Sequence, residues 1–195
     1  MNWSSPLLWF TVAQFQEAQL PNHSSQTVDW VVAMVDLHVI THSDLTFEQA
    51  LQQYYTLSFA PLEEKRKRSL EFLIDIHLLC DLANGVDIYQ VPSSKIEEEL
   101  AKLRSQFTTI QDFNQFLLSH GVTESSLKER LDCYLSGEQV AYRYVVTSQN
   151  SEPEIQLQVY TEMMRELWER KPPRIISAQR LPSQKPIYES ERTSD

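Results

Sequence analysis

Residues 62–85 read LEEKRKRSLEFLIDIHLLCDLANG, and this stretch decides the fold. Its first third is charged, and the remainder is almost entirely apolar, with apolar residues recurring at helical spacing on both sides. A helix that is apolar nearly all round must be enclosed by other elements. Pro61 suits the start of such a helix, and Asn84-Gly85 suits its end. The sequence therefore predicts one buried central helix that the rest of the chain surrounds.

Size and charge limit the possible classes of protein. The chain has 195 residues, which fits one domain with tails. It carries 17 basic and 27 acidic residues, a formal charge of −10. Nucleic-acid binding requires a basic surface that neutralises phosphates, so we expect no nucleic-acid partner. The apolar part of the central stretch is shorter than the roughly 20 residues that span a bilayer, so we expect no integral membrane segment.

The segments before the central stretch predict a hairpin and a helix. Residues 28–35 and 39–41 are rich in β-branched residues and flank a tight turn, which is typical of two antiparallel strands. Residues 46–49, TFEQ, have the form of a capping box that opens a helix, and Pro61 would end that helix. The first 25 residues permit two interpretations, a truncated signal peptide or an N-terminal arm.

After the central stretch the pattern is helical. Residues 86–91 predict a loop or short strand, and Ser94 with Glu97 predicts a capped helix. A second helix would end at Gly121, and a third, long helix would begin after Thr123. Gly137 lies inside that long helix, where glycine costs about 1 kcal/mol relative to alanine, so a packing reason or a kink is expected.

The C-terminal part predicts a linker, a helix and a strand. Residues 147–152 are polar and unpatterned, and Pro153 opens an amphipathic helix. Residues 174–181 suit a strand, and we expect disorder in residues 182–195. The two cysteines, Cys80 and Cys133, have no CxxC spacing and suit either buried thiols or one disulfide.

Four passages in this order resemble the core of the SurA-like periplasmic chaperones. Residues 28–45 are similar to the opening strand, turn and strand of that family, and residues 70–83 are similar to its buried helix. Residues 96–135, which include GVTESSLKERL, follow its helix, short helix and helix pattern. Residues 163–181 resemble the C-terminal helix and strand that return to the N-terminal region in the family.

The resemblance implies a mainly α fold: a helical chaperone core with a small antiparallel hairpin completed by a C-terminal strand. One core would span residues 26–181, with an N-terminal part at 26–147, the linker at 147–152, and a returning helix and strand at 153–181. Family members commonly carry parvulin-type prolyl isomerase domains where this chain has only the linker. We therefore expect no isomerase activity. A short linker also permits a domain-swapped dimer as well as a monomer.

Polar clusters give no catalytic or metal motif. His38 and His42 are four residues apart with Asp36 and Asp44 nearby, but this spacing matches no standard metal site. We interpret these four residues as solvated groups on the hairpin rim. His77 is interpreted as a core histidine, because no acid or nucleophile stands in a motif-like relation to it.

Two charge runs have simple interpretations. Residues 65–68 and residues 97–99 are each expected to form a solvated helix face. For the basic run, contact with an acidic partner or anionic lipid is the alternative. We predict no catalytic residue, no metal and no cofactor.

Aromatic and methionine side chains are the candidate binding residues. Most suit a core, but methionine also suits adaptable binding surfaces, and an exposed apolar groove would need a function. The candidate peptide-binding set comprises Phe107, Phe113, Phe116, Leu117, Met163, Met164, Leu167 and Trp168. The leading hypothesis is a periplasmic holdase that binds unfolded outer-membrane or secreted polypeptides. The alternatives are the scaffold of an isomerase lacking its catalytic domain and a helical adaptor in envelope assembly.

Overall fold

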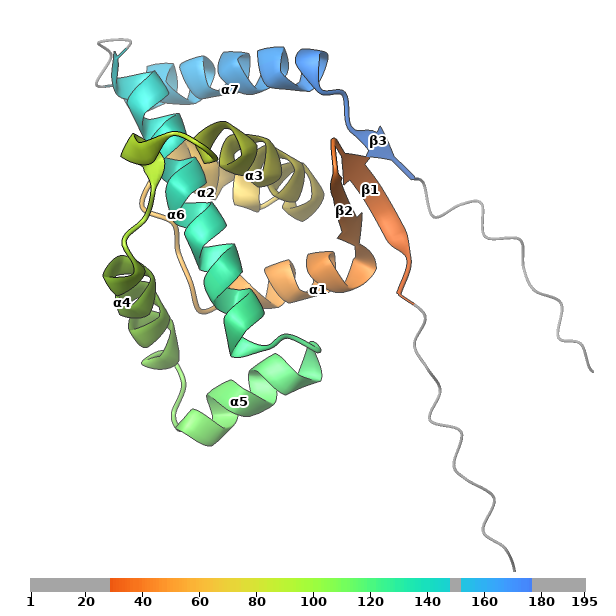
Figure 1. Ribbon diagram of the computed structural model, residues 1–195, viewed down its shortest axis with the longest axis vertical. Helices are drawn as coiled ribbons and strands as arrows, with labels where there is room; N and C mark the ends of the chain where they lie inside the picture. Colours follow the sequence, from red (N-terminus) through yellow and green to blue (C-terminus); the bar gives the residue numbers. More distant parts are fainter. Residues whose placement is uncertain (1–28, 148–151, 177–195) are drawn as a thin grey trace, which may run out of the picture.

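The computed structural model describes residues 29–147 and 152–176, and helices dominate these residues (Figure 1). In chain order the elements are β1 (Val31–Val35), β2 (His38–Thr41), α1 (His42–Leu51), α2 (Ala60–Arg66), α3 (Ser69–Ala83), the short 3-10 helix η1 (Asp87–Tyr89), α4 (Ser93–Arg104), α5 (Ile110–Ser119), α6 (Glu124–Thr147), α7 (Pro153–Arg170) and β3 (Arg174–Ile175). The prediction of a mainly α fold with a small hairpin and a C-terminal strand is confirmed.

The central helix α3 is buried nearly all round, as its composition predicts. Phe72, Ile74 and Leu79 have no exposed surface, and α1, α2, α6 and the hairpin pack around them. Gly85 adopts a positive φ of 81° just after the helix, which is the left-handed stop that its sequence predicts.

The predicted single helix over residues 62–85 is wrong in one respect, because it is broken into α2 and α3 at Lys67-Arg68. The Gln52 side-chain amide donates to the Arg66 carbonyl oxygen at 2.7 Å. This bond satisfies a carbonyl at the end of α2 that has no partner within that helix. Pro61 lies in the first turn of α2, as expected.

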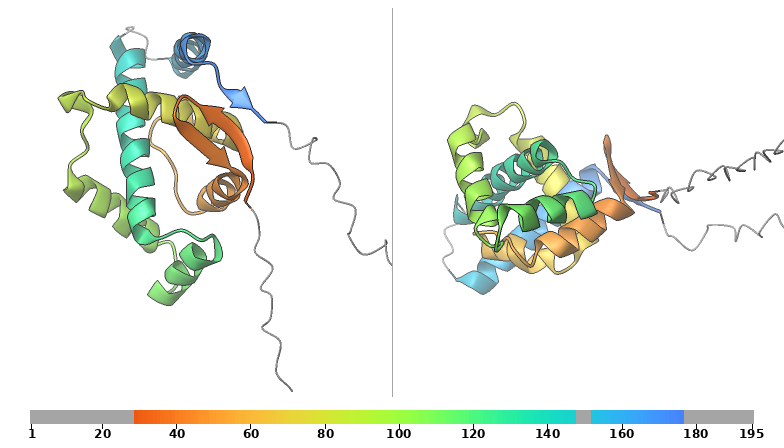
Figure 2. Two further views of the ribbon diagram at one scale, coloured as in Figure 1. Left: turned by 45° about the vertical axis from the view of Figure 1, so that its right-hand side comes forward. Right: turned by 90° about the horizontal axis from the view of Figure 1, so that it is seen from below.

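The two ends of the described chain meet in one antiparallel sheet of order β2-β1-β3 (Figure 2). In β1, Ala33 is paired with Ile175 and Met34 with Arg174, and the Ile176 N–H donates to the Val32 carbonyl oxygen at 2.8 Å. The C-terminal strand therefore does return to the N-terminal hairpin. The strands β1 and β3 are shorter than the predicted ranges 28–35 and 174–181, whereas β2 begins one residue before the predicted range 39–41. Residues 28 and 177–181 lie outside the described part.

Two of the predicted helix caps differ from those observed. Helix α1 begins at His42, not after Thr46, because Thr41 and Asp44 form a reciprocal capping box. It ends at Leu51, well before Pro61. Helix α4 begins after Pro92 without a side-chain cap, so Ser94 and Glu97 do not form the expected box. Within residues 86–91, where a loop or short strand was expected, residues 87–89 form the single 3-10 turn η1.

Gly137 lets α6 pack closely against α3. A Cβ atom at this position would lie 2.9 Å from Ile76 Cδ1 and 3.2 Å from Leu79 Cβ, closer than unstrained carbon contacts. The glycine therefore has the packing reason that its place inside a long helix indicates. Helix α6 begins after Thr123, whose hydroxyl accepts from the Ser126 N–H, as predicted.

The remaining predictions about chain ends fall on residues that are not described. These are the arm or signal remnant at 1–25, the tail at 182–195, and the linker, of which residues 148–151 are not described. Within the described ranges, no helix combines the length and apolar character that crossing a membrane requires.

Candidate peptide-binding groove

A groove of about 580 Å³ lies between α3, α7 and the turn that leads into β3. Its apolar walls come from Met164, Trp168, Pro172, Pro173 and Ile175. Helix α7 lies across the body of the molecule, and β3 leaves its C-terminal end toward the hairpin (Figure 1). The groove thus forms where the returning segment rejoins the N-terminal part of the chain.

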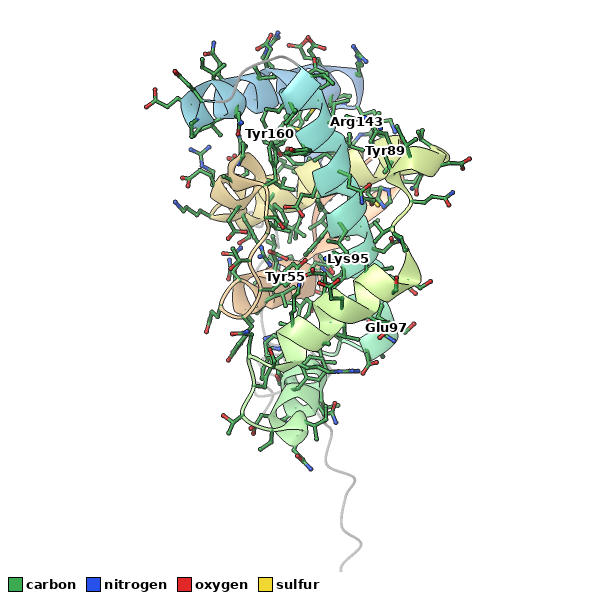
Figure 3. The ribbon with its side chains drawn as sticks, turned by 90° about the vertical axis from the view of Figure 1, so that its left-hand side faces the viewer. Tyr55, Tyr89, Lys95, Glu97, Arg143 and Tyr160 are labelled. Atoms are coloured by element: carbon green, nitrogen blue, oxygen red, sulfur yellow. The ribbon has the colours of Figure 1, made fainter. Side chains whose placement is uncertain are left out.

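The sequence of the returning segment explains how these walls arise. Tyr160, Met163 and Met164 recur at helical spacing and are buried, which fixes the inner face of α7. Figure 3 shows Tyr160 on the side of α7 that faces the body. Pro172 and Pro173 cannot continue a helix, so the chain leaves α7 and enters β3 in an extended conformation.

One buried carboxyl group, Asp75 of α3, lies at the groove and holds α7 in place. Its Oδ1 accepts from the Trp168 indole N–H at 2.7 Å, and its Oδ2 accepts from the Tyr160 hydroxyl at 3.1 Å. Burial raises the pKa of Asp75 to about 6, although the two hydrogen bonds act in the opposite direction. The group therefore titrates between mildly acidic and neutral pH.

The raised pKa of Asp75 predicts that the free energy of unfolding changes with pH, and it fixes the direction of that change. Because the folded-state pKa of about 6 exceeds the ordinary 3.8, the folded protein binds more protons than the unfolded chain between these values. The free energy of unfolding therefore loses an Asp75 contribution as pH rises. The Asp75→Asn variant lacks this titration. The free energy of unfolding of the variant minus that of the wild type should therefore rise by about 2 kcal/mol between pH 4 and pH 7. Urea unfolding of both proteins at each pH measures this change, and a difference that is equal at both pH values would contradict it.

Charged side chains surround the apolar walls. Arg165 is paired with Glu162 at 2.5 Å and also with Glu169, and Lys65 lies 3.9 Å from Glu71. Lys65, Glu71, Arg165 and Glu169 line the groove. Protein-binding surfaces have the same arrangement, an apolar centre surrounded by charged and polar side chains.

The predicted binding residues fall into two groups at opposite ends of the molecule (Figure 1). At the α5 end, Phe113 and Leu117 are buried, and Phe107 and Phe116 are partly buried. The Phe107 ring centroid lies 4.4 Å from that of Tyr54, so this group belongs to an aromatic cluster of the core.

The α7 group is the one that reaches the groove. Met163 and Met164 are buried, whereas Leu167 and Trp168 are partly buried. Met164 and Trp168 line the groove. The eight residues therefore do not form one continuous surface.

Sequence reasoning missed several groove residues, chiefly Asp75, the two prolines and Ile175. Asp75 carries the only detectable signal, because it interrupts the apolar run LIDIHLL of the central helix. A charged residue in such a run is almost never fully buried unless it is paired. The sequence identifies the proline pair only as a helix end and Ile175 only as part of a strand.

The basic run at residues 65–68 is not a uniform solvated face, which corrects the prediction. Arg66 is 1% exposed, and its Nε donates to Glu48 Oε1 at 2.5 Å. The Glu48 carboxylate also accepts from the Tyr134 hydroxyl, and the Arg66 guanidinium lies over the Tyr55 and Phe72 rings. Lys67 and Arg68 are exposed as predicted.

The acidic run at residues 97–99 is mostly a solvated face. Glu97 and Glu98 are exposed, while Glu99 is partly buried beneath Lys95 and Lys102 at 3.1 and 2.8 Å. Glu97 reaches toward α6, where its Oε1 lies 2.6 Å from Lys128 Nζ.

The polar residues around the hairpin have separate partners. Asp44 caps α1 and is paired with Arg130, Asp36 is paired with Lys171 at 2.5 Å, and His42 stacks on Trp30. Across residues 29–147 and 152–176, no group of three or more potential metal ligands gathers.

The two histidines beside the hairpin lie against each other. The His38 ring stacks on His77 with centroids 4.5 Å apart, and its Nε2 lies 2.8 Å from Asp81 Oδ1. Burial lowers the pKa of His77 to about 4. This histidine is therefore neutral at physiological pH.

Comparisons of the chain with protein-family models, with curated proteins and with solved structures find no match.

Proposed function

We propose that this protein is a periplasmic holdase that binds extended segments of unfolded outer-membrane or secreted polypeptides without chemistry. The observation that carries the proposal is the apolar groove beside β3, lined by Met164, Trp168 and Ile175. The resemblance of residues 28–181 to the SurA-like core supports the same class. The resemblance implies that a C-terminal helix and strand return to the hairpin, and α7 and β3 do so, which supports the proposal as well.

The strand β3 offers a second kind of contact next to the groove. It is an edge strand, because the sheet order is β2-β1-β3. The Ile176 N–H points toward β1, so in the alternating pattern of a strand the Ile175 N–H and C=O point to the free edge. An extended client could add a strand there while its apolar side chains enter the groove. Such binding depends on backbone groups and adaptable apolar contacts, which suits many different clients.

Light scattering of an outer-membrane β-barrel protein diluted from urea tests this function. We expect the wild-type protein, in several-fold molar excess, to suppress aggregation. Ile175→Asp places a carboxylate on the groove wall, and Ile175 is 57% exposed, so the fold should tolerate it. This variant should bind the client about tenfold more weakly, because the bound peptide would desolvate the new charge.

The matched control is Leu118→Asp, which puts the same charge on an exposed leucine of α5 at the other end of the molecule. It should suppress aggregation as well as wild type does. If wild type leaves aggregation unchanged, the holdase proposal is wrong. Equal loss in both variants would place binding outside the groove. Proline isomerisation above background, or one stoichiometric native partner, would favour the scaffold or adaptor alternative.

A further inference from the structure

The crossing of α3 and α6 brings together the two cysteines of the chain. Cys133 lies one turn before Gly137 on α6, and the position of a Gly137 Cβ is 3.8 Å from the Cys80 nitrogen on α3. Cys133 Sγ lies 3.9 Å from the Ile76 carbonyl oxygen, one turn before Cys80. Both cysteines are free thiols. The two cysteines therefore lie on neighbouring turns of α3 and α6 at this crossing.

Both thiols line a cavity of about 420 Å³ between the hairpin, α3 and α6. His77 and Arg130 also line it, and each cysteine is only partly buried. The space is comparable to a small ligand pocket, so a small disulfide reagent has room to reach sulfur. Structural cysteines that are fully buried lack this access.

The surroundings of the two sulfur atoms differ, which assigns them different roles. The Cys133 thiol and the Ser136 hydroxyl hydrogen-bond to Cys80 and lower its pKa, although burial opposes them. The same contact and burial raise the pKa of Cys133. Because the thiolate is the nucleophile, Cys80 attacks first and Cys133 follows.

We propose that Cys80 and Cys133 form a redox pair that a disulfide oxidant, such as oxidised glutathione, converts into a disulfide joining α3 to α6. In the first step the Cys80 thiolate bonds to one sulfur of the oxidant, and the other sulfur leaves as a thiolate. Cys133 then gives up its proton and bonds to Cys80 Sγ, and the second oxidant sulfur leaves as a thiolate. The protein dithiol loses two electrons, and the oxidant becomes two thiols after taking up two protons.

The disulfide would close a loop of about 50 residues that includes α4 and α5. Such a link removes conformations from the unfolded chain and stabilises the native state. This inference concerns the α3–α6 crossing and does not rest on the proposed holdase function. Loss of client binding would leave it unaffected.

Incubating the full-length protein with oxidised glutathione, followed by intact-mass measurement and thiol counting, tests the proposal. We expect the wild type to lose two hydrogen atoms and both free thiols without forming a disulfide between two chains. The Tm of the oxidised form should exceed that of the reduced form by about 10 °C. Cys133→Ser should keep one glutathione on Cys80, and Cys80→Ser should react at least about tenfold more slowly.

The reduced wild type is the matched reference, since it has the same sequence and lacks only the bond. Wild-type protein that carries two glutathione adducts would overturn the proposal, because it shows that the sulfur atoms cannot meet. Two thiols that stay free in excess oxidant, or a disulfide-linked dimer, would overturn it as well.

Discussion

Replacing Glu48 with alanine is expected to lower the free energy of unfolding by about 3–5 kcal/mol. The substitution removes the closest counter-charge of the buried Arg66 guanidinium, which keeps only the longer contact with Glu63 at 3.6 Å. It also removes the acceptor of the Tyr134 hydroxyl. Glu48 has no exposed surface and Arg66 is 1% exposed, so water cannot replace the lost partner. Chemical denaturation at neutral pH, with the m-value checked for two-state behaviour, measures the loss.

The control for this prediction is Glu64→Ala, which breaks an exposed ion pair with Lys67 at 2.5 Å on the same helix as Arg66. Solvent screens that pair, so its removal should leave stability almost unchanged.

The double variant Glu48→Leu with Arg66→Met separates the effect of the charges from the effect of packing. It should recover much of the stability lost in Glu48→Ala, because replacing both members of a buried pair by apolar groups is often neutral. Equal losses in Glu48→Ala and Glu64→Ala would contradict the assignment of a buried network.

Gly137→Val is expected to lower the free energy of unfolding by about 3 kcal/mol, because it overpacks the α3–α6 crossing. Even the first added carbon would lie 2.9 Å from Ile76 Cδ1 and 3.2 Å from Leu79 Cβ. The Leu79 Cβ atom is bonded directly to the α3 backbone, so it can move away only if the helix itself shifts. The loss should be visible as a lower urea midpoint.

Asp132→Val introduces the same side chain on the exposed face of α6 and is the matched control. Aspartate and valine have similar helix propensities, so the stability should change by no more than about 0.5 kcal/mol. A Gly137→Val protein as stable as this control would show that the crossing is looser than described.

Much of the architecture follows from local patterns in the sequence. The apolar composition of residues 69–83 predicts enclosure, and Gly85 and Gly121 mark helix ends because both adopt positive φ. The return of residues 174–176 to β1 was expected from the family resemblance, not from residue patterns alone. Two strand residues carry too little periodicity to identify their partner.

The errors arise where tertiary contacts decide between local alternatives. Residues 41–44 and residues 46–49 both have capping signatures, and the first pair is used because Thr41 ends β2. The break between α2 and α3 depends on Gln52 and Glu48, which lie far from it in sequence. Propensity cannot detect such partners.

The groove could be predicted only in part. The apolar spacing of Met164 and Trp168 indicates a helix face, but that pattern does not say which positions are covered. Phe113 and Met163 match the same pattern and are buried. Which of these side chains are exposed depends on the rotation of α7 about its own axis. Asp75 fixes that rotation through its hydrogen bonds with Tyr160 and Trp168.

The pairing of Ala33 with Ile175 has a consequence for the order in which the polypeptide acquires its structure. About 140 residues separate the two partners along the chain. During synthesis from the N-terminus, the outer side of β1 stays without its neighbour until nearly all of these residues have emerged. The hairpin therefore lacks its β3 neighbour while these residues are being made, and the contacts that β3 then forms also build the groove wall.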